Sequence, residues 1–479
     1  MPIPAQNPPE LNQNQNQTND LGQLEPGKAE TEFNPVSSKA NSKHKNNWWL
    51  IGLVLAGLFV GVVAILGFFF YPKIIEKVFH SPLTTEVEPE SAEVAFIDES
   101  YQTIKDNYWQ VLSDEQLVNQ FKLGLDLVYG PSPELKEKTP QALKTKITQL
   151  IKSQPNLDHQ KLLPQVVDYV LQNLEPKGRS KLYTKQLTEK LNQKVANINP
   201  TKDYLKTLEI SPEASDEAVA SAFEKKAEEV KKTATSSAEK EKQLAELKQA
   251  YQVLADEKNR QRYAQTKIEP TIDGKLLDAD TFYLKIKQFS PTTIEDMQHI
   301  IQTKLAGHRP HILILDLQDN IGGAIDYLPY LAGAFIGNNQ YAYQFFHQGK
   351  TEDYLTKNTF LPELTQFKQV AVLINGQTQS SAEVLAATLK KYNYGVLVGE
   401  TSKGWGTVER VFPLKHQLNH DQEYALFLVH RLTLRDDGLP IEGRGVEPDV
   451  KVSQPSWQQQ LAEYGFSSKV IGFVRELLK

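Results

Sequence analysis

The 479-residue sequence contains no cysteine and only two methionines. Without cysteine the chain can form no disulfide, thiolate zinc site or iron–sulfur cluster, and it has no cysteine nucleophile. Neither sign of charge dominates, because 53 Lys and Arg stand against 59 Asp and Glu and leave a net charge of −6. This balance argues against a protein whose main task is to bind nucleic acid. Hydrophobic residues make up 40% of the chain, which excludes wholesale disorder.

Several common chemical motifs are also missing. The ten histidines show no HExxH or similar spacing of metal ligands, and no phosphate-binding P-loop is present. The sequence Asp436-Asp437-Gly438 fits a β-turn better than a calcium loop, because oxygen ligands do not recur at alternate positions. The sequence therefore predicts no metal, no cofactor and no nucleic-acid partner.

The first 71 residues consist of a polar segment followed by an uncharged, apolar segment. Residues 1–47 are rich in Asn, Gln, Pro and Lys, and we predict a disordered tail because they offer too little apolar surface to offset ordering. Residues 48–71 carry no charge. They would form about 36 Å of helix, enough to cross a hydrocarbon core of about 30 Å. We expect one transmembrane helix here.

A cleaved signal peptide is the alternative interpretation of residues 48–71. The apolar run is too long for one, and no small-residue cleavage pattern follows it, so an uncleaved signal anchor is favoured. Three lysines within 39–45 precede the run, whereas Lys73 and Lys77 follow it. This excess predicts a single-pass membrane protein with a cytoplasmic N-terminus and an extracytoplasmic catalytic part. Glycines 57 and 61 form a GxxxG pattern, which leaves a homo-oligomer open.

Two helical regions are expected beyond the membrane segment. Residues 90–200 form an N-terminal helical region, in which Phe96, Tyr101, Ile104, Tyr108 and Val111 recur at helical spacing. Residues 201–265 predict a helical hairpin that starts near Ser215. Its facing apolar sides are Ala220, Phe223 and Ala227 on one helix, and Leu244, Leu247, Ala250, Tyr251 and Leu254 on the other.

The hairpin resembles a J-domain. DYLKTLEISPEASDEAV and QAYQVLADEKNRQRY are similar to the two ends of that family's frame. The family acts through a His-Pro-Asp turn between its long helices, but KKAEEVKKTATSS stands there in this chain. We therefore expect a structural or docking hairpin that does not stimulate a chaperone ATPase.

Residues 270–455 predict an α/β domain, followed by a C-terminal helix over 456–479. The β-rich runs are TFYLKIKQFS, HILILDLQ, KQVAVLIN, YGVLVGE and EYALFLVHRLTL, with helices expected at 291–305 and 380–391. Four turn-rich motifs follow strands in this domain: LDLQDNIGGAIDYLP, NGQTQSSAE, GETSKGWGTVE and RDDGLPIEGRGVEPD. Taken alone, Ser380 or Ser381 at the start of a helix is more simply explained as an N-cap.

Together and in this order, the four motifs resemble the C-terminal processing peptidases, also called tail-specific serine proteases. The resemblance covers about residues 275–452 and implies an α/β core similar to the ClpP/crotonase ββα fold. It implies a polypeptide substrate and no cofactor. The family normally carries a PDZ domain that grips substrate C-termini, and here the J-like hairpin takes that place.

The resemblance assigns roles to specific residues. Ser380 takes the position of the nucleophile, three residues before Glu383. The backbone N–H of Ser381 and one from Gly322-Gly323 take the oxyanion hole, where two fixed donors would each lower the barrier by about 3 kcal/mol.

The general base departs from the family pattern. Alignment of the glycines places Trp405 where the family has its catalytic lysine, and indole has no basic nitrogen. Lys403 lies two residues earlier and is a candidate base, Glu409 could orient a base, and His430 on a neighbouring strand is a further candidate.

Three interpretations remain open. The chain is an active serine peptidase with Lys403 or another substitute base, or it has the peptidase fold without turnover and binds extended peptides. In the third interpretation it is a structural, membrane-anchored scaffold.

Overall fold

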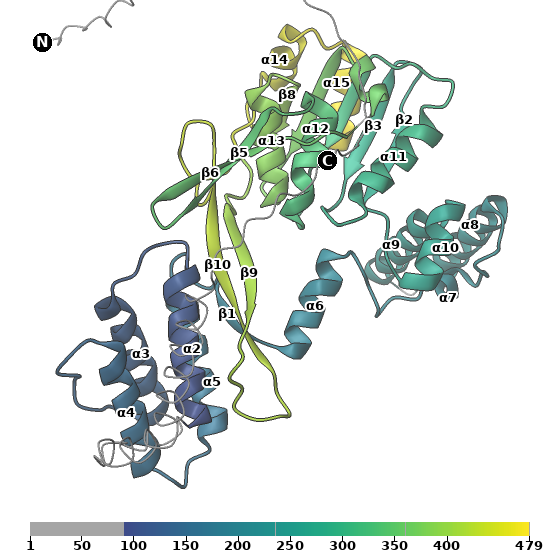
Figure 1. Ribbon diagram of the computed structural model, residues 1–479. Coiled ribbons are helices and arrows are strands. Elements are labelled where there is room, and N and C mark those ends of the chain that lie inside the picture. The colour runs from purple at the N-terminus through teal and green to yellow at the C-terminus, as the bar shows by residue number, and fades with distance from the viewer. Residues whose placement is uncertain (1–90, 235, 360, 479) are drawn as a thin grey trace, which may run out of the picture. The chain divides into compact units, whose positions relative to one another are not determined.

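The computed structural model describes residues 91–234, 236–359 and 361–478 (Figure 1). The predicted tail at 1–47 and the predicted transmembrane helix at 48–71 lie outside the described residues. Among the described residues, no helix is both long and apolar enough to cross a membrane. The described chain is a mixed α/β structure with helices before its β-rich core, as expected. The similarity to the ClpP/crotonase fold stays a prediction.

The N-terminal helical region packs four helices around one apolar cluster. Phe96, Tyr101, Ile104 and Tyr108 are buried as the helical spacing predicts, whereas Val111 is 63% exposed because the first helix ends at Asn107. The region continues into a short strand and a further helix. Its elements are α2 (Ala92–Asn107), α3 (Asp114–Tyr129), α4 (Pro140–Ser153), α5 (His159–Asn173), β1 (Lys181–Thr184) and α6 (Lys185–Val195).

The J-like segment contains four helices with a core of their own. The predicted hairpin is present, flanked by two shorter helices, and the Ser215 side chain caps its first long helix by accepting a hydrogen bond from the Ala218 N–H. Phe223 stacks on Tyr251 across the hairpin, with ring centroids 4.8 Å apart. The helices are α7 (Tyr204–Leu208), α8 (Asp216–Thr233), α9 (Ser237–Leu254) and α10 (Glu257–Thr266).

A six-stranded sheet forms the centre of the α/β domain. Its order is β11-β8-β7-β4-β3-β2, with parallel neighbours except for the antiparallel edge strand β2. The predicted helices at 291–305 and 380–391 are confirmed as α11 (Thr293–Lys304) and α13 (Ser381–Lys391). The strands are β2 (Ile272–Leu276), β3 (Thr281–Ile286), β4 (Ile312–Asp316), β7 (Gln369–Ile374), β8 (Val396–Gly399) and β11 (Val450–Lys451).

Helices cover both faces of this sheet (Figure 1). On one face α11, α12 (Leu328–Ile336) and α13 share an apolar cluster with the strands. On the other face lie α14 (Trp457–Glu463) and α15 (Ser468–Leu477). The single C-terminal helix expected over 456–479 is wrong, because the chain turns between α14 and α15 at Gly465, whose φ of +88° favours glycine.

A second sheet joins the α/β domain to the N-terminal helices. Its path is β1-β10-β5-β6, and β9 also pairs with β10. One face of β10 packs on the apolar cluster of α2–α5. The strands are β5 (Tyr341–His347), β6 (Lys350–Leu355), β9 (Thr407–Pro413) and β10 (Tyr424–Leu434). The turns after β4 and β7 leave the same edge of the central sheet, because the two strands are parallel neighbours.

Candidate active site

Ser380 lies in the turn between β7 and α13. Its backbone has φ 56° and ψ −127°, a conformation that residues with a side chain rarely adopt. An ordinary N-cap serine has extended backbone angles, so a capping role alone does not account for Ser380. Strained turns that join a strand to a helix hold nucleophilic serines in other hydrolases, because they present the hydroxyl at the end of the sheet.

The Gly322-Gly323 turn after β4 lies directly against Ser380. A Cβ placed on Gly322 would come within 2.6 Å of the Ser380 Cβ and 3.0 Å of the Ser381 amide nitrogen. A Cβ on Gly323 would come within 2.0 Å of the Phe289 carbonyl oxygen, and both glycines have positive φ. Glycine is required here because the turn backbone approaches the serine and its neighbours too closely for any side chain.

The turn also decides which amides could form an oxyanion hole. The Gly322 N–H donates a hydrogen bond to Asn320 Oδ1 at 2.8 Å, so it is already engaged. Within the described residues, the N–H groups of Ser381 and Gly323 donate no hydrogen bond. Ser381 is the first residue of α13, where the helix dipole favours developing negative charge. Of the two glycines, Gly323 is therefore the available partner for Ser381.

A pocket of about 410 Å³ brings several predicted residues together. Ser380, Lys403, Trp405 and Glu409 all line it, with both glycines of the turn after β4. Its other walls come from α6, β10 and the turns beside the glycines. The remaining lining residues are Leu191, Lys194, Val195, Gln288, Ile321, Gln379 and Phe427.

Trp405 occupies the position of the family lysine and is held on two sides. The Arg179 guanidinium carbon lies 3.4 Å from the centroid of its ring, a cation–π contact. Its indole N–H donates to Glu409 Oε1 at 3.3 Å, and Thr407 donates to the same oxygen at 2.6 Å. Burial raises the pKa of the Glu409 carboxyl, although these hydrogen bonds and Arg179 oppose the shift. Glu409 is thus a titratable group beside the pocket rather than a solvated surface carboxylate.

Glu383 connects the serine turn to the turn that carries Trp405. The residue is fully buried, and its carboxylate accepts four hydrogen bonds. Oε2 accepts from the N–H groups of Ser380 and Trp405, both at 2.8 Å, while Oε1 accepts from Ser402 Oγ and the Gly404 N–H, both at 2.6 Å. Burial raises the pKa of Glu383, and the four donors counteract this shift. This carboxyl fixes the position of Ser380 relative to residues 402–405.

Lys403 and His430 differ in their placement. Lys403 is exposed at the pocket, and its Nζ lies 5.6 Å from the centroid of the Trp405 ring. His430 is not among the pocket residues. Its Nδ1 lies 2.7 Å from the Asn107 carbonyl oxygen and its ring packs near His347, while burial lowers its pKa. The structure therefore brings Lys403, but not His430, to the pocket of Ser380.

The sequence analysis missed Arg179 and Glu442. Arg179 donates to Glu442 Oε1 at 2.8 Å, and Glu442 Oε2 accepts from the Gly406 N–H at 2.8 Å. Glu442 lies in the fourth of the turn-rich motifs, RDDGLPIEGRGVEPD, whereas Arg179 lies outside the residues that carry the resemblance. The two residues are 263 positions apart in the chain, so no local pattern reveals their pairing.

These features define an α/β protein in which a serine with strained backbone lies at a pocket built from the turns that follow two neighbouring strands. Residues 280–452 match the sequence model of Peptidase family S41, and residues 203–264 match that of the DnaJ domain. The chain thus contains one segment that is similar to the S41 peptidases and another that is similar to the DnaJ domain.

Curated relatives match the same part of the chain. A "Carboxy-terminal-processing protease" of Bartonella bacilliformis is 30% identical over 182 residues, 37% of this chain and 40% of that protein. A "Probable CtpA-like serine protease" of Staphylococcus epidermidis is 28% identical over 181 residues, 36% of this chain and 34% of that protein. The chain thus spans two fifths or less of the length of these relatives.

Among solved structures, the photosystem II D1 C-terminal processing protease has 15% sequence identity with this chain. The comparison covers 76% of this chain and 93% of that chain, with a TM-score of 0.44.

Proposed function

We propose that this protein is a serine endopeptidase that cleaves unfolded or extended polypeptide segments, with Ser380 as its nucleophile. The observation that supports the proposal is the strained backbone of Ser380 at a pocket, beside two unengaged amide donors. The name of one relative, "Carboxy-terminal-processing protease", supports the further proposal that the cleaved segments lie near carboxyl termini.

In the proposed reaction the Ser380 hydroxyl attacks a peptide carbonyl carbon and loses its proton to a base. The oxygen of the tetrahedral intermediate becomes negative and accepts hydrogen bonds from the Ser381 and Gly323 N–H groups. Collapse of the intermediate releases the amine product with the proton and leaves an acyl-enzyme. Water then hydrolyses the acyl group, and the pocket needs no cofactor for these steps.

Two residues beside the pocket are candidates for the base. Lys403 is exposed to solvent at the rim of the pocket. Glu409 is half-buried with a raised pKa, and as a carboxylate it could accept the serine proton. The environment therefore favours Glu409 over the predicted Lys403.

The pH profile separates the two candidates. If Glu409 is the base, cleavage requires its carboxylate, so activity rises with pH through a value above the ordinary 4.5 of a glutamate. Glu409→Gln then removes most activity at every pH, whereas Lys403→Ala retains it. Loss of activity in Lys403→Ala, with Glu409→Gln still active, would instead identify a displaced Ser–Lys pair.

The experiment that tests the function itself is cleavage of an unfolded protein by the full-length chain. Ser380→Ala should abolish cleavage, and a fall of about 10⁶-fold is typical for loss of a serine nucleophile. Ser467→Ala, at the N-cap of α15, is a matched control that should retain activity because it lies outside the pocket. Cleavage that persists in Ser380→Ala would refute the assignment.

A second candidate function is peptide binding without turnover. The observation that favours it is Trp405, whose ring is held by Arg179 in the position of the family lysine. In this case the parent chain would bind unfolded protein without cleaving it, and Trp405→Lys would be the variant expected to gain cleavage.

We further propose that residues 48–71 anchor the protein in a membrane, with residues 1–47 in the cytoplasm and the peptidase part outside. The uncharged 24-residue run and the preceding lysines support this proposal. Substrates would then be extracytoplasmic polypeptides near the membrane.

A further inference from the structure

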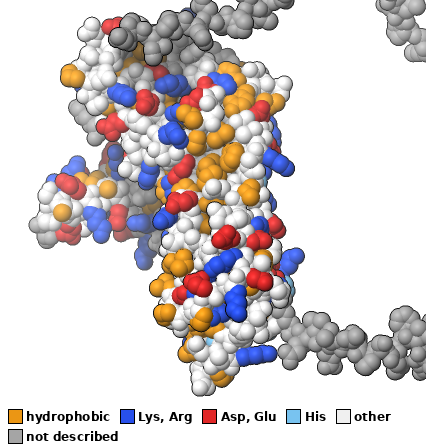
Figure 2. Space-filling view, turned by 90° about the vertical axis from the view of Figure 1, so that its left-hand side faces the viewer, with side chains coloured by type: hydrophobic (Ala, Val, Ile, Leu, Met, Phe, Trp, Pro, Cys, Tyr) orange, Lys and Arg blue, Asp and Glu red, His pale blue; other side chains and the backbone are white. Residues whose placement is uncertain are grey.

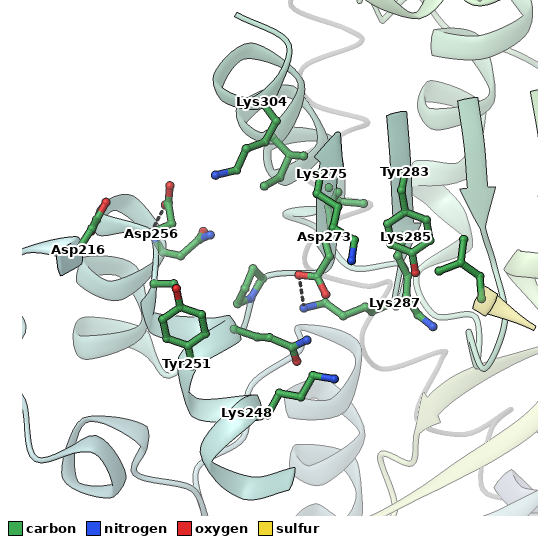
Figure 3. A pocket seen from close by; sticks show the side chains of 18 residues that line it. Asp216, Lys248, Tyr251, Asp256, Asp273, Lys275, Tyr283, Lys285, Lys287 and Lys304 are labelled. Atoms are coloured by element: carbon green, nitrogen blue, oxygen red, sulfur yellow. Dashed lines mark hydrogen bonds and ion pairs between the residues drawn. The ribbon is translucent and has the colours of Figure 1, made fainter. Parts of the chain in front are cut away.

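A second and larger pocket, of about 890 Å³, lies between the DnaJ domain and the edge of the central sheet (Figure 3). One wall consists of residues from α9 and α10, and the other of residues from β2, β3 and α11. Ser380 and the other residues of the proposed active site do not line it. The proposed peptidase reaction therefore does not account for this second pocket.

The free edge of β2 faces this pocket. Alternate residues of β2 bond to β3, as the bonds from Lys287 N–H to the Thr271 carbonyl and from Leu277 N–H to the Thr281 carbonyl show. The N–H and C=O groups of Gly274, between them, therefore point away from β3. Gly274 lines the pocket, and no hydrogen bond from its N–H occurs within the described residues. Such an edge can accept an additional strand.

The pocket is rich in lysine. Five lysines line it against three aspartates. Asp216 is paired with Arg260, and Asp256 lies 2.8 Å from His299 Nε2. Lys285 is paired with Asp316, and Lys287 with Asp273. Lys248, Lys275 and Lys304 are exposed and form no ion pair within the described residues. Figure 3 shows these three lysines around the pocket: Lys248 on α9, Lys275 on β2 and Lys304 on α11.

The unpaired lysines are placed on both sides of the free edge. A Cβ on Gly274 would meet Ile300 of α11, so α11 and Lys304 lie on that face of the sheet. Lys275, the next residue of β2, points to the opposite face. Successive side chains of a strand added at this edge would alternate between the two faces, and each face offers a cation.

The two walls of the pocket are joined by polar contacts between α11 and the segment that forms and precedes α10. Arg262 contacts Asp296 at 2.6 Å, Lys258 contacts Glu295 at 2.7 Å, and His299 Nε2 lies 2.8 Å from Asp256. On the face shown in Figure 2, by contrast, acidic and basic side chains are interspersed. The pocket differs from that face in having an excess of lysine beside a free strand edge.

We propose that the pocket between the DnaJ domain and β2 binds an acidic, extended polypeptide segment. The segment adds as a strand to the free edge of β2, and its carboxylates pair with Lys248, Lys275 and Lys304. The site recruits acidic polypeptides to the protein independently of the chemistry at Ser380.

Fluorescence anisotropy with a short labelled peptide of glutamate, valine and threonine tests this proposal. The full-length chain is used as Ser380→Ala, so that cleavage does not intervene. We expect saturable binding that weakens with added salt, and a loss of about tenfold or more in affinity for the double variant Lys275→Glu, Lys304→Glu. The matched control, Lys225→Glu with Lys242→Glu, reverses two exposed lysines of α8 and α9 that do not line the pocket. It should bind within about twofold of the parent.

Two altered peptides separate charge from strand pairing. The glutamine version should bind at least tenfold more weakly, because it keeps the strand and loses the carboxylates. A version with proline at alternate positions should also bind weakly, because proline cannot donate to the strand edge. Equal binding of the glutamine peptide, or no effect of reversing Lys275 and Lys304, would overturn the proposal. Undiminished binding of the proline peptide would refute the strand addition.

Discussion

Among single residues, Ser380 says most about the site, because its backbone conformation is strained. Its conformation costs on the order of 1–3 kcal/mol for a residue with a side chain. The Glu383 carboxylate offsets this cost locally, because it accepts the Ser380 N–H and three further donors from residues 402–405. A serine needed only to cap a helix would not require this arrangement, which supports a role in presenting the hydroxyl.

Gly322→Ala tests how closely the glycine turn must approach the serine. The new methyl group would lie 2.6 Å from the Ser380 Cβ, and alanine would have to adopt a φ of +83°. We expect peptide cleavage to fall by about 10²-fold or more, because the serine and the Ser381 amide are displaced together. The measurement is kcat on an unfolded protein substrate, with the melting temperature measured in parallel. Gly472→Ala is the control, since a Cβ there meets no atom within 4 Å. Normal kcat in Gly322→Ala would show that the turn does not belong to the site.

At the scale of elements, the segment 402–406 is positioned by two carboxylates from other motifs, the fully buried Glu383 and the mostly buried Glu442. Glu383 at the start of α13 bonds to Ser402, Gly404 and Trp405, and Glu442 bonds to the Gly406 N–H. Arg179, which precedes β1, pairs with Glu442 and covers the Trp405 ring. The segment between α5 and β1 therefore contacts the pocket through the Arg179 guanidinium.

Arg179→Met should destabilise the protein by about 3 kcal/mol, because it leaves the Glu442 carboxylate without its partner in a mostly buried site. Burial already raises the pKa of Glu442, and Arg179 opposes this effect. Glu442→Gln in the same chain should recover part of the loss, since no buried charge is then left unpaired. Chemical denaturation of the parent, both single variants and the double variant measures the coupling. Strict additivity of the two changes would contradict it.

At the scale of the whole molecule, the described residues contain several separate apolar clusters. The DnaJ domain has its own cluster and is attached to α11 by ion pairs of α10. The N-terminal helices share theirs with β10. The surface of the DnaJ domain forms one wall of a lysine-rich pocket.

The DnaJ domain should not stimulate a chaperone ATPase. The segment between α8 and α9 has no His-Pro-Asp sequence, on which the family's stimulation of such ATPases depends. ATP hydrolysis by a purified Hsp70-type chaperone should be the same with and without this protein, whereas an authentic J-protein should accelerate it. Acceleration by the full-length chain, lost in a variant with residues 203–264 deleted, would contradict this expectation.

Much of the fold followed from the sequence because its signals are local. Alternating and continuous apolar runs predicted the strands around β3, β4, β7, β8 and β10, and helical spacing predicted α11 and α13. Two local predictions failed where the chain leaves a helix. The expected C-terminal helix is divided by a turn at Gly465, and Val111 is exposed because α2 ends before it.

The site was only partly predictable for the same reason. Ordered motifs were enough to place Ser380, the glycine turn, Lys403, Trp405 and Glu409 in one region, and all of them line one pocket. The sequence could not show that the Gly322 N–H is already engaged by Asn320, or that His430 bonds to Asn107 instead of approaching Ser380. Both facts depend on hydrogen-bond geometry that spacing along the chain does not fix.

The sequence alone thus determined the order of the elements, the family of the peptidase part and the residue types available for chemistry, because each is written in short, contiguous patterns. The tertiary structure decided which of those residues meet. The pairing of Arg179 with Glu442, the buried carboxylate of Glu383 and the lysines around the free edge of β2 join segments far apart in the chain. Only the packed fold brings such segments within hydrogen-bonding and ion-pairing distance.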